Sequence, residues 1–205
     1  AALLHDVGKV RIPAEILHKP GPLSAEEQRI VREHARHGYE ILSAQAGVPA
    51  VAAEVAYQHH ERLDGTGYPR GLSAADIHPF ARITGVIDVF DAMTSEREFR
   101  SAFPPAQVLD LLSAGAGVQF DADTVRSLVL RVAPYPIGCC VRLDTGETAV
   151  VVDVNRRAPR RPVVRVVAEA SGRSIDAGAE IDLEKEPERS IVGVGDPEQA
   201  LAAVT

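Results

Sequence analysis

The sequence has few cysteines, no long apolar run and no excess of basic residues. Its two cysteines, Cys139 and Cys140, are adjacent. Adjacent cysteines make strained disulfides and poor metal ligands, so we expect a reduced chain in the cytoplasm. No apolar stretch approaches the roughly 18–20 residues that span a bilayer, which predicts no transmembrane helix. The formal net charge is −7, whereas a general coat for DNA or RNA would need a basic surface. A small anionic substrate remains compatible, because a local cluster of cations and metals can outweigh the global charge.

The chain also lacks an initiator methionine. It begins with Ala1-Ala2-Leu3-Leu4, already inside an apolar stretch. We therefore expect a truncated N-terminus, with helices missing upstream, and not a processed signal sequence. The length of 205 residues fits one medium domain with a small appendage.

Residues 1–133 predict helices joined by short loops. Ser24-Ala25-Glu26-Glu27 is a capping box, and the helix that it begins carries His34 and Leu42 on one apolar stripe. A second helix follows Pro49 and aligns Val51, Val55 and His59 on one face.

A third helix begins at Pro79 and extends from Phe80 to about Met93. It is apolar on nearly every side, which predicts that it is buried at the domain centre. Between the second and third helices, residues 64–71 read DGTGYPRG, and this density of turn residues predicts a loop. Two shorter helices are expected near 105–114 and 121–132.

Residues 134–205 predict a small β-rich module. β-branched runs at 141–143, 148–154 and 163–167 alternate with turns, which is typical of three to five short antiparallel strands. The stretch after Ala170 is acidic and predicts a loop. The fold class is therefore mainly α: an all-helical bundle followed by an antiparallel β module, either an SH3-like barrel or a hairpin. The predicted domain boundary lies at Pro134–Pro136.

Histidines and aspartates occupy positions on separate helices where solvent exposure is unexpected. A carboxylate inside an apolar helix, as at Asp88, is costly unless it is paired, hydrogen-bonded or bound to a cation. Considered alone, a histidine on an apolar stripe, such as His34, is more often a core residue than a metal ligand. Imidazole and carboxylate ligands without cysteine favour iron, manganese, zinc or nickel over a structural zinc cage. The candidate metal ligands are His5, Asp6, His34, His59, His60 and Asp88.

Two motifs resemble a known family. His5-Asp6-Val7-Gly8-Lys9 looks like the HD signature of the HD phosphohydrolase superfamily. Residues 59–69, HHERLDGTGYP, resemble the HHExxDGxGYP signature of its HD-GYP subfamily, with every fixed position matched. The resemblance covers about residues 1–133, and it implies an HD-type helical bundle that hydrolyses cyclic dinucleotides.

The resemblance also implies roles for individual residues. Asp6 would bridge two metal ions, the other five candidates would complete two or three metal positions, and iron or manganese is expected. Lys9 would hold a phosphate and assist the leaving group, and Arg97 and Arg100 would hold the second phosphate by forked hydrogen bonds. In place of the family's usual tyrosine before the last arginine, this chain has Phe99.

The implied reaction is metal-dependent hydrolysis of cyclic di-GMP to pGpG or GMP, in which metal ions activate a water and neutralise the phosphate. Cyclic GMP-AMP remains open as the substrate. Two alternatives of other classes are a non-catalytic sensor of cyclic dinucleotides and a general HD nucleotide phosphohydrolase.

Two further features leave their roles open. Tyr68, in the loop at the site mouth, could bind a substrate phosphate, contact a partner such as a cyclase or adaptor protein, or merely pack; a homodimer is also possible. Five arginines lie in one predicted hairpin. They could form a solvated loop, or they could contact an anion or a partner. They are Arg156, Arg157, Arg160, Arg161 and Arg165.

Overall fold

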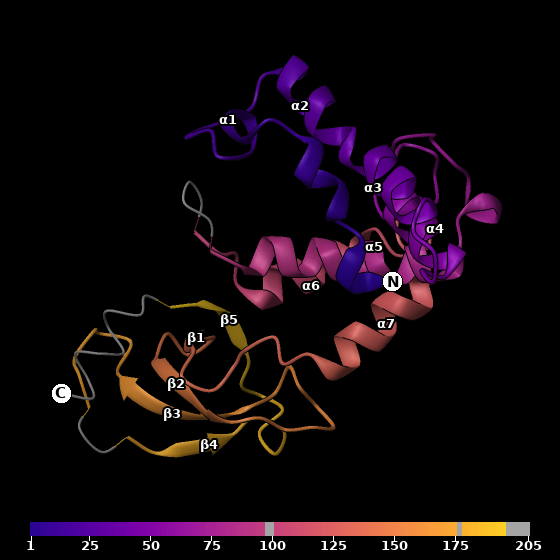
Figure 1. The fold of residues 1–205 in the computed structure, drawn as a ribbon. Helices are drawn as coiled ribbons and strands as arrows, with labels where there is room; N and C mark the ends of the chain where they lie inside the picture. Colours follow the sequence, from indigo (N-terminus) through magenta and orange to yellow (C-terminus); the bar gives the residue numbers. More distant parts are fainter. Residues whose placement is uncertain (97–100, 176–177, 196–205) are drawn as a thin grey trace. The chain divides into compact units, whose positions relative to one another are not determined.

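The computed structural model describes residues 1–96, 101–175 and 178–195. A mainly helical part precedes a single β-sheet, as expected (Figure 1). The helices are η1 (Ala2–Leu4), η2 (Val7–Arg11), α1 (Ala14–Leu17), α2 (Ala25–Arg32), α3 (His34–Ser43), α4 (Ala50–Gln58), η3 (Ala74–Asp76), α5 (Pro79–Thr94), α6 (Pro105–Ala114) and α7 (Ala122–Arg131). The strands are β1 (Cys140–Leu143), β2 (Thr148–Asp153), β3 (Val163–Ala168), β4 (Glu180–Asp182) and β5 (Ile191–Val194).

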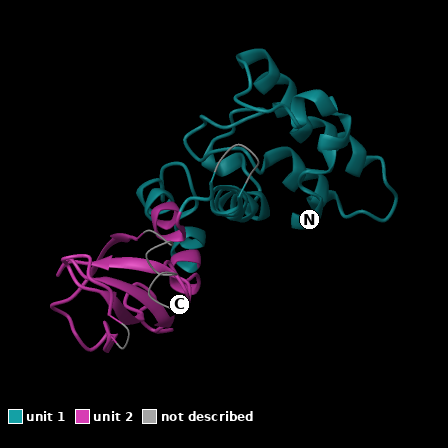
Figure 2. Ribbon diagram, turned by 90° about the vertical axis from the view of Figure 1, so that its left-hand side faces the viewer, with its two compact units in different colours: residues 1–103, 110–127 teal, residues 104–109, 128–205 magenta. Residues whose placement is uncertain are grey.

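The chain forms two compact units, which Figure 2 colours separately. Unit 1 contains residues 1–103 and 110–127, and unit 2 contains residues 104–109 and 128–205. The predicted boundary at Pro134–Pro136 remains a prediction.

The capping box forms as predicted, but the helix that it begins ends earlier. Ser24 accepts from the Glu27 backbone N–H, and the Glu27 carboxylate accepts from the Ser24 backbone N–H. The predicted continuous helix is interrupted at Glu33, so His34 begins a new helix, α3. At the break the Val31 carbonyl accepts both from a backbone N–H of the helix cap and from His34 Nδ1, the latter at 2.7 Å.

The core of unit 1 joins α3 to α4, which lie side by side (Figure 1). Leu42 of α3 packs on Ala52, Ala53 and Ala56 of α4, and these small side chains allow the helices to approach closely. A second cluster joins α4 to the start of α5 through Val55, Ile77 and Ala81.

The prediction that α5 is buried all round is wrong. Its buried face is formed by small or compact residues, including Ala81, Gly85 and Val86. Phe80, Ile83 and Ile87 are 54%, 45% and 44% exposed. These three positions share a helical face, so in the described residues α5 is buried on one side.

Unit 2 contains a five-stranded antiparallel sheet in the order β4-β3-β2-β1-β5. The three predicted strands form, but the expectation of a loop after Ala170 is wrong, because β4 and β5 follow it. Both are short edge strands, and an edge strand of three or four residues leaves little periodicity to detect. The described strands pair in an open order, and β4 and β5 form the two edges of the sheet. The strand pairing therefore does not show an SH3-like barrel.

The arginine-rich β2–β3 connection combines structural and exposed side chains. Arg161 donates to the carbonyls of Leu183, Glu186 and Arg189, and Arg165 pairs with Glu180 at 2.5 Å. Arg161 therefore links the β2–β3 connection to the segment between β4 and β5. A contact for an anion or partner stays a prediction for the exposed arginines.

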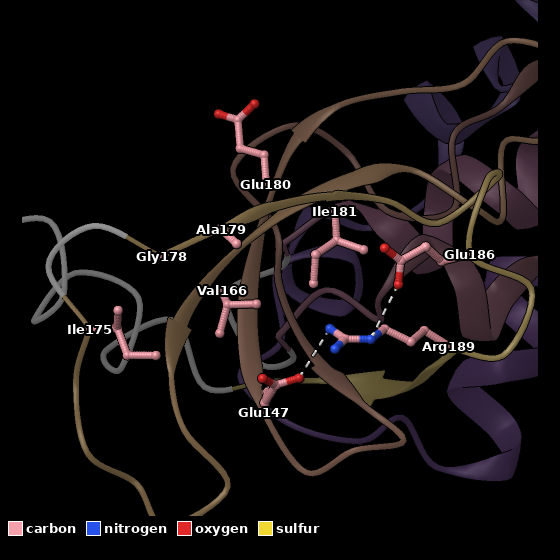
Figure 3. A pocket seen from close by; sticks show the side chains of 9 residues that line it. All are labelled: Glu147, Val166, Ile175, Gly178, Ala179, Glu180, Ile181, Glu186 and Arg189. Atoms are coloured by element: carbon pink, nitrogen blue, oxygen red, sulfur yellow. Dashed lines mark hydrogen bonds and ion pairs between the residues drawn. The ribbon is translucent and has the colours of Figure 1, made fainter.

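Unit 2 also has a pocket of about 380 Å³, with an apolar lining that includes Val166 and Ile181 (Figure 3). Arg189 forms ion pairs with Glu147 and Glu186, each at 3.4 Å. Arg189, Glu147 and Glu186 in the pocket lining are therefore paired with one another. No residue predicted as a site residue lines this pocket.

Candidate metal centre

Six side chains predicted from the sequence as metal ligands lie close together in unit 1. They come from four separate segments: the η1–η2 junction, the start of α3, the end of α4 and the middle of α5. Their ligand atoms form two overlapping groups, in each of which all atoms lie within 4.8 Å of one another. The groups are Asp6, His34, His59 and His60, and His5, His59 and Asp88.

The first group is centred on His34. Its Nε2 lies 3.1 Å from His60 Nε2, 3.4 Å from His59 Nε2 and 3.4 Å from Asp6 Oδ1. Ligands around an ion with metal–nitrogen distances near 2.1 Å are about 3 Å apart, so these spacings suit one cation.

The second group adds the carboxylate of α5. His5 Nε2 lies 3.4 Å from Asp88 Oδ1 and also 3.4 Å from Asp6 Oδ2. His60 Nδ1 lies 3.9 Å from Asp88 Oδ2. Asp6 thus offers one oxygen toward each group, which is the arrangement that a bridging carboxylate requires.

Backbone carbonyls orient three of the histidine rings. Nδ1 of His5 bonds to Ala2 at 2.6 Å, Nδ1 of His34 to Val31 at 2.7 Å, and Nδ1 of His59 to Ala56 at 3.0 Å. Each ring therefore donates Nδ1–H outward and, when neutral, directs the lone pair of Nε2 into the cluster. This is the usual way in which proteins fix the tautomer of a ligating histidine.

Two buried polar atoms of the cluster support a cation as its natural occupant. Among the described residues, His5 Nε2 and Asp6 Oδ1 are buried and have no hydrogen-bond partner. Orphaned buried polar atoms are costly, and coordination to a metal ion would satisfy both. The nitrogen and oxygen donors present therefore fit a divalent metal.

Burial and mutual repulsion keep the inner histidines neutral. Burial lowers the pKa of His34, and burial together with the charges of His5 and His34 lowers the pKa of His59 to about 4. The same kind of environment lowers the pKa of His60 to about 2, through burial and then the charges of His59 and His34. Neutral imidazole is the form that binds metal.

The pKa values of the outer pair, His5 and Asp88, shift in opposite directions. Burial by itself would raise the pKa of Asp88, but the His5 side chain and the neighbouring histidines outweigh it and lower that pKa to about 2. The Asp88 carboxylate in turn raises the pKa of His5. The cluster therefore holds a carboxylate at neutral pH, as a cation site needs.

The predicted substrate-binding residues lie partly beside this cluster. Lys9 Nζ is 2.5 Å from Asp6 Oδ2. The ring of Tyr68 stacks on His60, with centroids 4.6 Å apart and planes inclined by 23°. Arg97 and Arg100, with Phe99 between them, lie outside the described residues.

Glu61 holds the loop that carries Tyr68, a role that the sequence did not reveal. Its side chain is buried, and its two carboxylate oxygens accept from the backbone N–H groups of Arg70 at 2.8 Å and Leu72 at 2.9 Å. Gly67 brings the loop backbone directly onto this anchor, because a Cβ there would lie 2.3 Å from the Arg62 nitrogen. The sequence signal that could have revealed this role is the glutamate at a fixed position of the motif. A buried carboxylate needs hydrogen-bond partners, and the loop backbone supplies them.

Replacing Glu61 by alanine is expected to destabilise unit 1 by about 2–4 kcal/mol, because two part-buried N–H donors lose a buried acceptor. Urea denaturation followed by far-UV circular dichroism measures this loss. Glu33→Ala, which removes an exposed partner of Arg36, is the control and should cost less than about 1 kcal/mol. Equal stabilities of the two variants would show that Glu61 does not anchor the loop.

Comparison with known proteins identifies the family. The HD domain family model matches residues 1–124, and a second model, described as a KOW domain associated with HD domain, matches residues 140–203. Since the first match spans more than half of the chain, this chain belongs to the HD domain family. The HD-GYP resemblance is confirmed as well, by relatives and a solved structure of that type.

The curated relatives carry two kinds of name: cyclic di-GMP phosphodiesterase and 3'3'-cGAMP-specific phosphodiesterase. The cyclic di-GMP phosphodiesterase PA4108 of Pseudomonas aeruginosa is 39% identical over 173 residues, which cover 84% of this chain and 42% of that protein. The cyclic di-GMP phosphodiesterase response regulator RpfG of Xanthomonas campestris pv. campestris is 45% identical over 63% of this chain and 34% of its own length. The 3'3'-cGAMP-specific phosphodiesterase 2 of Vibrio cholerae is 43% identical over 63% of this chain and 25% of its own length.

The chain thus spans less than half the length of each of these relatives. A solved structure, Bd1817, a HDGYP protein from Bdellovibrio bacteriovorus, matches with a TM-score of 0.50 and 21% identity. That match covers 62% of this chain and 40% of Bd1817, and it shows a shared fold. No described helix is both long and apolar enough to cross a membrane.

Proposed function

We propose that this chain carries a metal-dependent phosphodiesterase site that hydrolyses cyclic di-GMP to pGpG or GMP. The observation that carries the proposal is the pair of overlapping ligand groups that share His59, with Asp6 oriented toward both. Two adjacent ligand groups suit two metal ions, and the names of the relatives support a cyclic dinucleotide as the substrate. Iron or manganese fits the nitrogen and oxygen donors, with a third ion as a further option.

The proposed roles follow from the contacts of each side chain. Asp6 would bridge the metal positions, and His5, His34, His59, His60 and Asp88 would complete them. When bound, the metal ions would supply an activated water and neutralise charge on the phosphate. Lys9, whose ammonium lies beside Asp6, would hold the scissile phosphate and assist the leaving group.

The remaining roles concern the substrate and its surroundings. Tyr68 would contact the substrate from the loop, and Arg97 and Arg100 would hold the second phosphate. The cytoplasmic location stays a prediction. A cyclase or adaptor bound at the GYP loop, and a homodimer, stay predictions.

The decisive experiment combines metal analysis with turnover. Protein loaded anaerobically with iron or with manganese is expected to hold about two metal ions per chain by mass spectrometry. The same samples should convert cyclic di-GMP to linear products that chromatography resolves, and chelation should abolish the conversion. Full metal loading with tight nucleotide binding and no turnover would support the sensor alternative instead.

Substrate choice is measured in the same assay. 3'3'-cGAMP competes directly with cyclic di-GMP, and the ratio of kcat/KM values decides between them. Hydrolysis of linear dinucleotides at a similar rate would favour the general HD nucleotide phosphohydrolase.

A further inference from the structure

Arg32, at the end of α2, has an unusual electrostatic environment for an exposed arginine. Its neighbours along the same chain segment are paired: Arg29 contacts Glu26, and Arg36 donates to Glu33 at 2.8 Å. Within residues 1–96, 101–175 and 178–195, no carboxylate lies at ion-pair distance from Arg32. A guanidinium left without a carboxylate is available to an external anion.

The Arg32 guanidinium also lies over an aromatic ring. Its Cζ lies 5.0 Å from the centroid of the Tyr68 ring. Tyr68 stacks in turn on His60, and His60 Nε2 is 3.1 Å from His34 Nε2 inside the cluster. An unbroken series of contacts therefore connects Arg32 to the candidate metal centre through one aromatic ring.

This arrangement suits recognition of a phosphate. A cation–π contact holds the guanidinium over the ring while its N–H donors remain able to bond an oxyanion. The planar fork of arginine matches two phosphate oxygens, and charge assistance strengthens both bonds. Lys9, another cation beside the cluster, already contacts Asp6 at 2.5 Å, so it does not duplicate this role.

We propose that Arg32, held over Tyr68, forms a subsite for the substrate phosphate that is not cleaved at the His/Asp cluster. The inference rests on the proposed function and adds Arg32 of α2 to Arg97 and Arg100, to which the proposed function assigns the same phosphate. Tyr68 then acts as a positioning residue for Arg32, in addition to any contact of its own with substrate.

The test compares a substrate with two phosphates and a substrate with one. In Arg32→Ala, KM for cyclic di-GMP is expected to rise about tenfold or more, with little change in kcat, because charge-assisted bonds to the uncleaved phosphate are lost. For bis(p-nitrophenyl) phosphate, which has a single phosphate, kcat/KM should remain within about twofold. Metal content should match that of the unaltered protein.

Two matched variants sharpen the test. Arg29→Ala removes an arginine of the same helix that is paired with Glu26, and it should leave both substrates unaffected. Arg32→Lys should recover only part of the lost affinity, because an ammonium cannot form the forked pair of bonds.

The outcomes separate the subsite from the proposed function. An unchanged KM for cyclic di-GMP in Arg32→Ala, or an equal loss with both substrates, would overturn the subsite. If the unaltered protein cleaves bis(p-nitrophenyl) phosphate but neither binds nor cleaves cyclic di-GMP, the proposed function fails, and the subsite falls with it. If the unaltered protein binds cyclic di-GMP without cleaving it, the catalytic proposal alone fails, and a tenfold weaker Kd in Arg32→Ala still supports the subsite.

Discussion

Replacing Asp6 by asparagine is expected to reduce kcat for cyclic di-GMP by at least about 1,000-fold and to lower the metal content. The side chain keeps its size, but the amide removes a negative charge that belongs to the first ligand group and lies 3.4 Å from His5 of the second. Metal ions contribute several kcal/mol to phosphoryl transfer, and each ~1.4 kcal/mol corresponds to a factor of ten. Steady-state kinetics and metal analysis on the same preparation measure the two effects.

Asp123→Asn is the matched control for the change at Asp6. Its side chain is 88% exposed and pairs with Arg126 at 3.5 Å. This variant should retain full turnover and full metal content. If Asp6→Asn retained both as well, Asp6 would not be a bridging ligand, and the metal centre as proposed would be wrong.

Replacing Gly8 by alanine is expected to destabilise unit 1 by about 3 kcal/mol or more. A Cβ at this position would lie 1.9 Å from the His34 carbonyl oxygen and 2.4 Å from the Gly38 nitrogen. Both obstacles are backbone atoms of α3, so η2 and α3 would have to separate. Because His34 is itself a candidate ligand, weaker metal binding should accompany the loss of stability.

Urea denaturation of the metal-free protein, followed by the helical signal in circular dichroism, measures the effect. Gly193→Ala is the control, since its Cβ would meet only the Arg142 side chain at an ordinary 3.8 Å. That control should change stability by less than about 1 kcal/mol. A Gly8→Ala protein as stable as the control would mean that η2 can move away from α3 at little cost.

The local elements were largely predictable because their signals are local. The capping box at Ser24, the proline that begins α5 and the β-branched runs of β1, β2 and β3 each act within a few residues. The errors arose where distant contacts intervene. The predicted helix ends beside His34, whose ring joins the cluster formed with His59, His60 and Asp6. Edge strands β4 and β5 gain their structure from pairing with β3 and β1.

The candidate site was predictable for a different reason. A histidine or aspartate amid apolar residues is costly unless it has a partner. Asp88 and His34 therefore indicated a cluster before any geometry was known. Glu61 and Arg32 were not assigned roles, because an exposed arginine on a helix or a motif glutamate has many ordinary explanations in sequence.

The sequence by itself determined the chemical types of the ligands, the motif that contains His59, His60 and Tyr68, and the division into helical and β-rich parts. Only the tertiary structure decided which atoms meet: Asp6 between two ligand groups, and Arg32 over Tyr68. The physical reason is that periodicity defines which face of a helix is apolar but not which faces pack together. The convergence of residues 5–6, 34, 59–60 and 88 depends on close backbone packing, such as Gly8 against α3 and Gly85 against His59.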